Sequence, residues 1–153
     1  MLKFKLTPAQ EFLCLCIRHC DFLQQDRIKA LYNSIGDEEL FSEAELNGVA
    51  SIVAHSLSIV LGADNVPEHW LEEYKAIDDR IVSYMGELEK VAQLLDENDI
   101  ALLALKNSGI TIGLYPHYGS CPMGDVDVLV SKKTFRQAHA ILTEAGYKLK
   151  FRS

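Results

Sequence analysis

The sequence has 153 residues, of which 48% are hydrophobic and 24% are charged, and its formal net charge is -7. This length fits one globular domain or two small ones, and the ordinary apolar content argues against a disordered tail, a collagen-like repeat and a disulfide-dense miniprotein. The charge is uneven: residues 1–100 hold 8 basic and 19 acidic side chains, whereas residues 101–153 hold 7 and 3. The anionic first part disfavours nonspecific nucleic-acid binding there, and the basic last third is suited to face a phosphate.

The N-terminal segment lacks the apolar stretch of a signal peptide, and no charge-free run approaches the roughly 20 residues that span a bilayer. We therefore expect a cytoplasmic protein with no membrane segment. Cys14, Cys16 and Cys20 share one predicted helix with His19, but their spacing is not that of a Cys-x-x-Cys zinc site. Small buried apolar side chains in a reducing compartment are the favoured interpretation, and zinc binding is the alternative.

Residues 1–98 show the apolar periodicity of helices. Thr7 followed by Pro8 is a typical helix start. The predicted helices are residues 8–20, 21–32, 43–61 and about 68–95. The last of these is long and amphipathic. Core packing is the favoured role of its aromatic residues, with base stacking as the alternative; they are Trp70, Tyr74 and Tyr84.

The pattern changes at Asn98. The predicted elements that follow are a strand at 100–105, a short helix at 110–115, a loop at 117–124, a strand at 126–130, a helix at 132–145 and a strand at 147–151. The first strand is a continuous apolar run, which suits burial on both faces. The sequence therefore predicts an α+β protein, with a helical region at 1–98 and a β-α-β-α-β unit at 99–153.

Asp125 and Asp127 are two of the three acidic side chains in the last third. Residues two apart in a strand point to the same face, so both carboxylates can bind one shared cation. Hard oxygen ligands of this kind suit Mg²⁺. The alternative is that both face water at a sheet edge, because Asp-x-Asp pairs are frequent on surfaces.

A phosphate site is predicted one element upstream, where the first strand ends at residues 106–109 and runs into a helix. Backbone N–H groups and the positive end of the helix dipole face outward there. Ser108 can add a hydroxyl donor, and Lys106 can add positive charge. The alternatives are helix capping for Ser108 and simple solvation for Lys106.

Together these motifs resemble the uncharacterised nucleotidyltransferase family within the DNA polymerase beta superfamily. The matching motifs are Leu105-Lys106, Tyr115-Pro116, Gly124-Asp125-Val126-Asp127-Val128-Leu129-Val130 and Ala145-Gly146-Tyr147. The resemblance covers roughly residues 43–150, and the joint spacing is more specific than any single motif. It implies that residues 99–153 are the first part of a polymerase-beta-type nucleotidyltransferase domain.

The resemblance also implies roles for individual residues. Asp125 and Asp127 match the catalytic ligands of Mg²⁺ or Mn²⁺, and Asn107-Ser108 stands where a phosphate-binding Gly-Ser is expected. Together with Lys106 and Gly109 of the same turn, Asn107 and Ser108 are the predicted nucleotide-binding residues. The implied reaction transfers a nucleoside monophosphate from a nucleoside triphosphate, with ATP as the expected donor. The acceptor is not identified by the sequence, which carries no membrane signal and no strong nucleic-acid signal.

The loop before the Asp pair departs from the expected pattern. Cys121 stands where the family usually has a basic residue. Gly119-Ser120 is a second candidate for the phosphate turn, ranked lower because it lies too close to Asp125 to leave room for the intervening helix. His117 lies in the same loop and is either exposed or near a substrate.

Three basic residues begin the last predicted helix: Lys132, Lys133 and Arg136. They are either solvated or help to neutralise a triphosphate.

The superfamily also implies a third carboxylate on a later strand, yet the only acid after Asp127 is Glu144, near the end of a predicted helix. The sequence leaves three explanations open: a missing C-terminal segment, a partner chain that supplies the rest, or a catalytically inactive nucleotide-binding or regulatory module. A helical interaction protein in which the Asp pair is inert is a further alternative.

Overall fold

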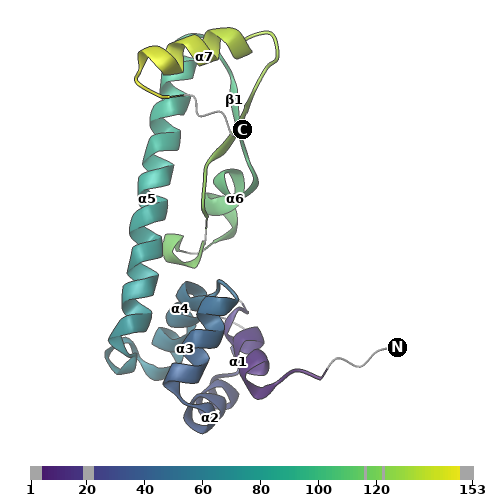
Figure 1. The fold of residues 1–153 in the computed structure, drawn as a ribbon, viewed down its shortest axis with the longest axis vertical. Helices are drawn as coiled ribbons and strands as arrows, with labels where there is room; N and C mark the ends of the chain where they lie inside the picture. Colours follow the sequence, from purple (N-terminus) through teal and green to yellow (C-terminus); the bar gives the residue numbers. More distant parts are fainter. Residues whose placement is uncertain (1–4, 19–22, 116, 122, 149–153) are drawn as a thin grey trace. The chain divides into compact units, whose positions relative to one another are not determined.

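The computed structural model describes residues 5–18, 23–115, 117–121 and 123–148. The chain forms two compact units: residues 1–80 with 117–122, and residues 81–116 with 123–153 (Figure 1). The structure is mostly helical with one small sheet, which confirms the α+β class. The division at residues 98 and 99, which was based on predicted secondary structure, stays a prediction.

The first unit packs short helices around one core. Its elements are α1 (Pro8–Cys16), α2 (Gln25–Ile35), α3 (Asp37–Leu46), α4 (Ala50–Leu61), η2 (Ala63–Asn65), the first part of α5 (Glu68–Asp96) and η3 (Tyr118–Ser120). The largest side chains buried here are Trp70, Phe12, Ile28, Leu40 and Leu57. None of the described helices is long and apolar enough to cross a membrane.

The start of α1 is as predicted. The Thr7 hydroxyl accepts the N–H of Gln10, and the Gln10 side chain accepts the N–H of Thr7, which is a complete capping box. The predicted end at Cys20 is wrong, because the helix stops at Cys16; residues 19 and 20 lie outside the described residues.

The cysteines of α1 differ from one another. Cys16 is buried, and this burial raises the pKa of its thiol to about 12, so it behaves as the predicted small apolar side chain. Cys14 is exposed, and the prediction of burial is wrong for it. Residues two positions apart on a helix lie on roughly opposite sides of it, which explains why Cys16 is buried and Cys14 is exposed.

The single helix predicted over 43–61 is two helices, α3 and α4. Gly48 has φ +66°, its N–H bonds the carbonyl of Glu45, and the N–H of Val49 bonds the carbonyl of Ala44. This is the Schellman ending, in which a residue in the left-handed region stops the helix. The periodic apolar run concealed the break, because both helices bury their apolar faces in the same core.

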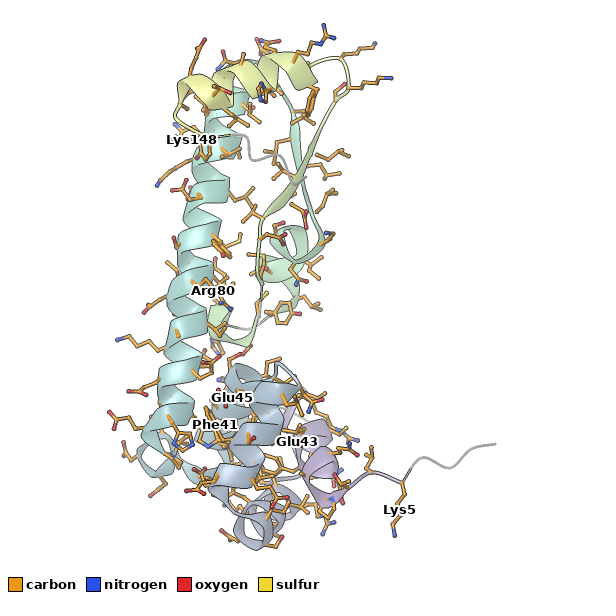
Figure 2. All side chains as sticks on the ribbon, in the orientation of Figure 1. Lys5, Phe41, Glu43, Glu45, Arg80 and Lys148 are labelled. Carbon is orange, nitrogen blue, oxygen red and sulfur yellow. The ribbon has the colours of Figure 1, made fainter. Side chains whose placement is uncertain are left out.

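Trp70 is fully buried near the start of α5, as its predicted core role requires. Phe41, labelled in Figure 2, meets the Trp70 ring edge-on with 4.8 Å between ring centroids. The Trp70 Nε1–H donates to Asp37 Oδ1 at 2.7 Å, which satisfies the one polar group that burial would otherwise leave unpaired.

The second unit contains the sheet. Its elements are the rest of α5, β1 (Leu102–Leu105), α6 (Lys106–Leu114), β2 (Asp127–Val130) and α7 (Phe135–Glu144). The strands are antiparallel, with Leu103 opposite Leu129 and Leu105 opposite Asp127. Leu102 and Val130 pack on the other face of the sheet against buried residues of α5 and α7.

Several expectations about this unit are corrected. The first strand is not buried on both faces, because the Leu103 side chain is 59% exposed. The helix after it begins at Lys106, not at 110, and the last helix begins at Phe135 with Thr134 as N-cap, not after Ser131. The sheet has two strands among the described residues, and most of the strand predicted at 147–151 lies outside them.

Gly48→Ala is expected to lower the free energy of unfolding by about 1 kcal/mol, because an L-residue is strained at φ +66°. Gly86→Ala is the control: Gly86 lies within α5 with open space around it, so alanine there should stabilise by about 0.5–1 kcal/mol. Urea denaturation of both variants measures the difference. Equal effects of the two substitutions would contradict the assigned turn.

Candidate functional site

The candidate site lies where β1 runs into α6 and where β2 begins. Lys106 Nζ is 2.7 Å from Asp127 Oδ2, so the predicted phosphate-binding lysine and the predicted metal-binding aspartate are in direct contact. The hydrogen bond to Asp127 raises the pKa of the Lys106 ammonium group, and the charges of Asp127 and then Asp125 act in the same direction. Both carboxylates therefore act on the same cationic position.

Lys106 adopts φ +50°, a backbone region that non-glycine residues rarely occupy. This conformation costs on the order of 1–2 kcal/mol. Strain of this kind is often found at functional sites, where the surrounding structure enforces it.

Ser108 joins α6 to β2. Its buried hydroxyl accepts the backbone N–H of Asp127 at 3.0 Å and lies 2.6 Å from the carbonyl oxygen of Leu105. The backbone of Asp127 is thereby fixed against the first turn of the helix. The hydroxyl is occupied by these contacts, and its predicted role toward a phosphate stays a prediction.

Gly109 allows the helix to approach the strand. A Cβ at this position would lie 2.6 Å from the carbonyl oxygen of Ala104, closer than van der Waals contact permits. Asn107 and Gly109 both lie in the first turn of α6, where backbone N–H groups have no partner within the helix. The N-terminal amides of α6 are thus brought close to the carboxyl end of β1.

Asp125 is exposed and precedes β2, which begins at Asp127, so only one of the two aspartates belongs to the observed strand. The residue before Asp125 is held from α5, because the Tyr84 hydroxyl donates to the carbonyl oxygen of Gly124 at 3.1 Å. The sequence pattern favours core packing over base stacking for Tyr84 and does not predict this hydrogen bond. The sequence contained no signal for this contact, since the partner is a backbone carbonyl forty residues away.

Gly119 and Ser120, the alternative phosphate turn, are buried in the first unit. The N–H of Gly119 donates to Asp78 Oδ1 at 3.0 Å. A phosphate at this turn would be repelled by the Asp78 carboxylate, and the N–H of Gly119 already donates to that carboxylate. The turn is therefore poorly suited to binding an anion.

His117 packs on His55, with 4.7 Å between ring centroids, and His55 also stacks near Tyr74. Burial lowers the pKa of His55, and the nearby His117 acts in the same direction. His117 thus contacts α4 through His55, and both residues belong to the first unit.

The residues of the α6–β2 site fit a divalent cation. Two carboxylates act on one cationic position beside helix N-terminal amides, and Mg²⁺ is typically held by one or two carboxylates together with substrate phosphates. Among the described residues, no group of three or more His, Cys, Asp or Glu could hold a metal. Glu144 is exposed in the last turn of α7.

These features define an α+β protein with an Asp-x-Asp pair beside a strand-to-helix turn. The sequence profile of the uncharacterised nucleotidyltransferase family matches residues 33–153, and the chain belongs to this family. The resemblance seen in the sequence is thus confirmed, and membership supports a general role in nucleotidyl transfer. Neither the curated proteins nor the solved structures contain a match to the chain.

Ser108→Ala is expected to lower the free energy of unfolding by about 1–3 kcal/mol, because the N–H of Asp127 loses its partner in a buried place. Ser83→Ala, at an exposed position of α5, should change it by less than about 0.5 kcal/mol. Chemical denaturation measures both. A Ser108→Ala protein as stable as the Ser83→Ala protein would show that the contact does not hold β2.

The lowered pKa of His55 predicts a pH dependence of stability. His55 binds its proton more tightly in the unfolded chain than in the folded one. The contribution of neutral His55 to the free energy of unfolding is therefore complete above about pH 6.5 and is lost as the pH falls below this value. His55→Gln should reduce this loss between about pH 7 and pH 5, whereas His139→Gln, at an exposed position of α7, should not. Denaturation at several pH values tests this, and an unchanged slope in His55→Gln would refute it.

Proposed function

We propose that this protein is a metal-dependent nucleotidyltransferase of the DNA polymerase beta superfamily. Asp125 and Asp127 bind Mg²⁺ or Mn²⁺, and the first turn of α6, residues 106–109, binds the phosphates of a nucleoside triphosphate, with ATP as the expected donor. The observation that carries the proposal is the 2.7 Å contact between Lys106 and Asp127, because it brings the carboxylate and the N-terminal end of α6 together at one place.

Each part of the site has a separate task. A bound Mg²⁺ ion would neutralise phosphate charge and orient the reacting phosphorus. Lys106 has a long exposed side chain, so its ammonium group can pair with Asp127 in the free protein and with a phosphate when a nucleotide is bound. Ser108 and Gly109 position the helix against β2, and the backbone N–H groups of the first turn, including that of Asn107, face the triphosphate.

In the proposed reaction an acceptor hydroxyl or phosphate oxygen attacks the α-phosphorus. The bond from this phosphorus to the bridging oxygen breaks, pyrophosphate leaves with that electron pair, and a hydroxyl acceptor releases its proton to solvent or a base. Asp125 and Asp127 bear charge close to the reacting phosphates and are therefore needed both for binding and for turnover.

A second candidate is a nucleotide-binding module without catalysis. It is favoured by one observation: the described residues place no third carboxylate beside Asp125 and Asp127. Since a third acid helps to complete the metal site or to deprotonate the acceptor, its loss should affect turnover more than nucleotide binding.

The test is to incubate the protein with α-labelled ATP and Mg²⁺ and to measure both nucleotide binding and transfer of label. Asp125→Asn and Asp127→Asn should weaken Mg²⁺-dependent ATP binding at least about tenfold, since each removes a charge from the cation site. Asp96→Asn, at the exposed end of α5, is the charge-matched control and should bind like the unaltered protein.

The outcomes separate the candidates. Transfer of label to an acceptor or to the protein supports the enzyme, and binding without transfer supports the inactive module. Unchanged ATP binding in both aspartate variants would overturn the site assignment.

A further inference from the structure

The face of the sheet that carries Asp127 has two exposed apolar side chains. Leu103 and Leu129 form a cross-strand pair on this face, and their side chains are 59% and 53% exposed. Asp127 lies two residues before Leu129 and therefore points to the same side. The opposite face packs against α5 and α7, whereas the part of the chain that the structure describes leaves this pair exposed.

A hollow of about 880 Å³ adjoins this face where β2 ends and α7 begins. It is lined by Leu129, Val130, Ser131, Lys132, Lys133, Phe135 and Arg136, which we call the β2–α7 corner. The surface of the hollow is mainly apolar, although several of the lining residues end in a charged group. Phe135 is 59% exposed. A large aromatic ring left in water at the edge of a hollow costs free energy unless a ligand covers it.

The same corner is strongly basic. Lys132, Lys133 and Arg136 are exposed, and no acidic residue occurs between Asp127 and Glu144. Among the residues that the structure describes, none of these three cations has a carboxylate partner. Their charge is therefore available to an anionic ligand.

We propose that the β2–α7 corner binds the acceptor, and that the acceptor is the end of a single-stranded nucleic acid. Its phosphates pair with Lys132, Lys133 and Arg136, and a base stacks on Phe135. An acidic peptide would pair with the cations but leave Phe135 in water, whereas a nucleic acid satisfies both features. This assignment rests on the proposed nucleotidyl transfer at Asp127.

The distance between Asp127 and the β2–α7 corner suits a nucleic acid that is bound at the corner and reacts at the Asp pair. Strands rise about 3.3 Å per residue, so Leu129, the first residue of the corner, lies about 7 Å along β2 from Asp127. A nucleic acid held at the corner reaches the Asp pair with its last few nucleotides across the Leu103–Leu129 surface. Its terminal hydroxyl is then the group that attacks the α-phosphorus, and the product is the strand extended by one nucleotide plus pyrophosphate.

The test uses the full chain and short fluorescein-labelled single-stranded RNA and DNA oligonucleotides, with binding followed by anisotropy over a range of salt concentrations. Lys132→Glu/Lys133→Glu should lower affinity at least about tenfold and reduce the slope of log K against log salt by about 1.4. Phe135→Ala should lower affinity about fivefold or more with little change in that slope. The control Lys29→Glu/Lys75→Glu changes net charge equally at exposed positions of α2 and α5.

Several results would overturn the proposal. They are absence of oligonucleotide binding at low salt, equal losses in the two double variants, and equally good competition by polyglutamate or by anionic lipid vesicles. Circular dichroism of each variant shows that a loss of binding is not a loss of folding.

Magnesium-dependent ATP binding, measured on the same variants, separates this proposal from the proposed function. Lys132→Glu/Lys133→Glu should leave ATP binding unchanged, and a loss would assign the corner to the donor triphosphate and overturn the acceptor assignment. Asp127→Asn should lose ATP binding while it retains oligonucleotide binding. Oligonucleotide binding with no ATP binding in the unaltered protein would overturn nucleotidyl transfer but leave the corner as a nucleic-acid site.

Discussion

The hydroxyl of Ser108 bonds the backbone of Asp127, and the candidate site depends on this contact. It joins the first turn of α6 to the first residue of β2, although the two bonded residues are 19 positions apart in the sequence. With the hydroxyl in place, the Asp127 carboxylate meets the Lys106 ammonium group and lies beside the helix N-terminus. Gly109 is required for the same reason, since any Cβ there would push α6 away from β1.

A second constraint is that a very small sheet needs other elements to cover one of its apolar faces. Two strands of four residues cannot bury an apolar face by themselves, and here one side is covered by Leu95 of α5, Ala138 of α7 and Ile100, which precedes β1. On the other side, where Asp127 lies, the side chains of Leu103 and Leu129 are exposed. An uncovered face beside a charged pair is where a substrate can be bound without displacing any part of the fold.

Charge is divided along the sequence, but not at the boundary between the two units. The helical first hundred residues have an excess of acidic side chains, whereas the basic side chains of the last third include Lys106 at the Asp pair and the three cations of the β2–α7 corner. The arrangement favours phosphate groups beside Lys106 and the β2–α7 corner and disfavours them at the acidic helices. Family membership supports nucleotidyl transfer, and this distribution of charge is consistent with a substrate that carries phosphates.

The sequence by itself determined the α+β class, the long helix α5 and the N-cap of α1, and it nominated the residues of the candidate site, because each depends on short-range patterns: periodicity, cap residues and an Asp-x-Asp spacing. It missed the break at Gly48, since two helices that share one core have the same apolar period as a single helix. Only the tertiary structure decided that Ser108 bonds to the Asp127 backbone, that Tyr84 holds Gly124, and that Leu103 is exposed. These contacts join residues 19 to 40 positions apart or depend on which face of the sheet is covered, and no local pattern encodes either property.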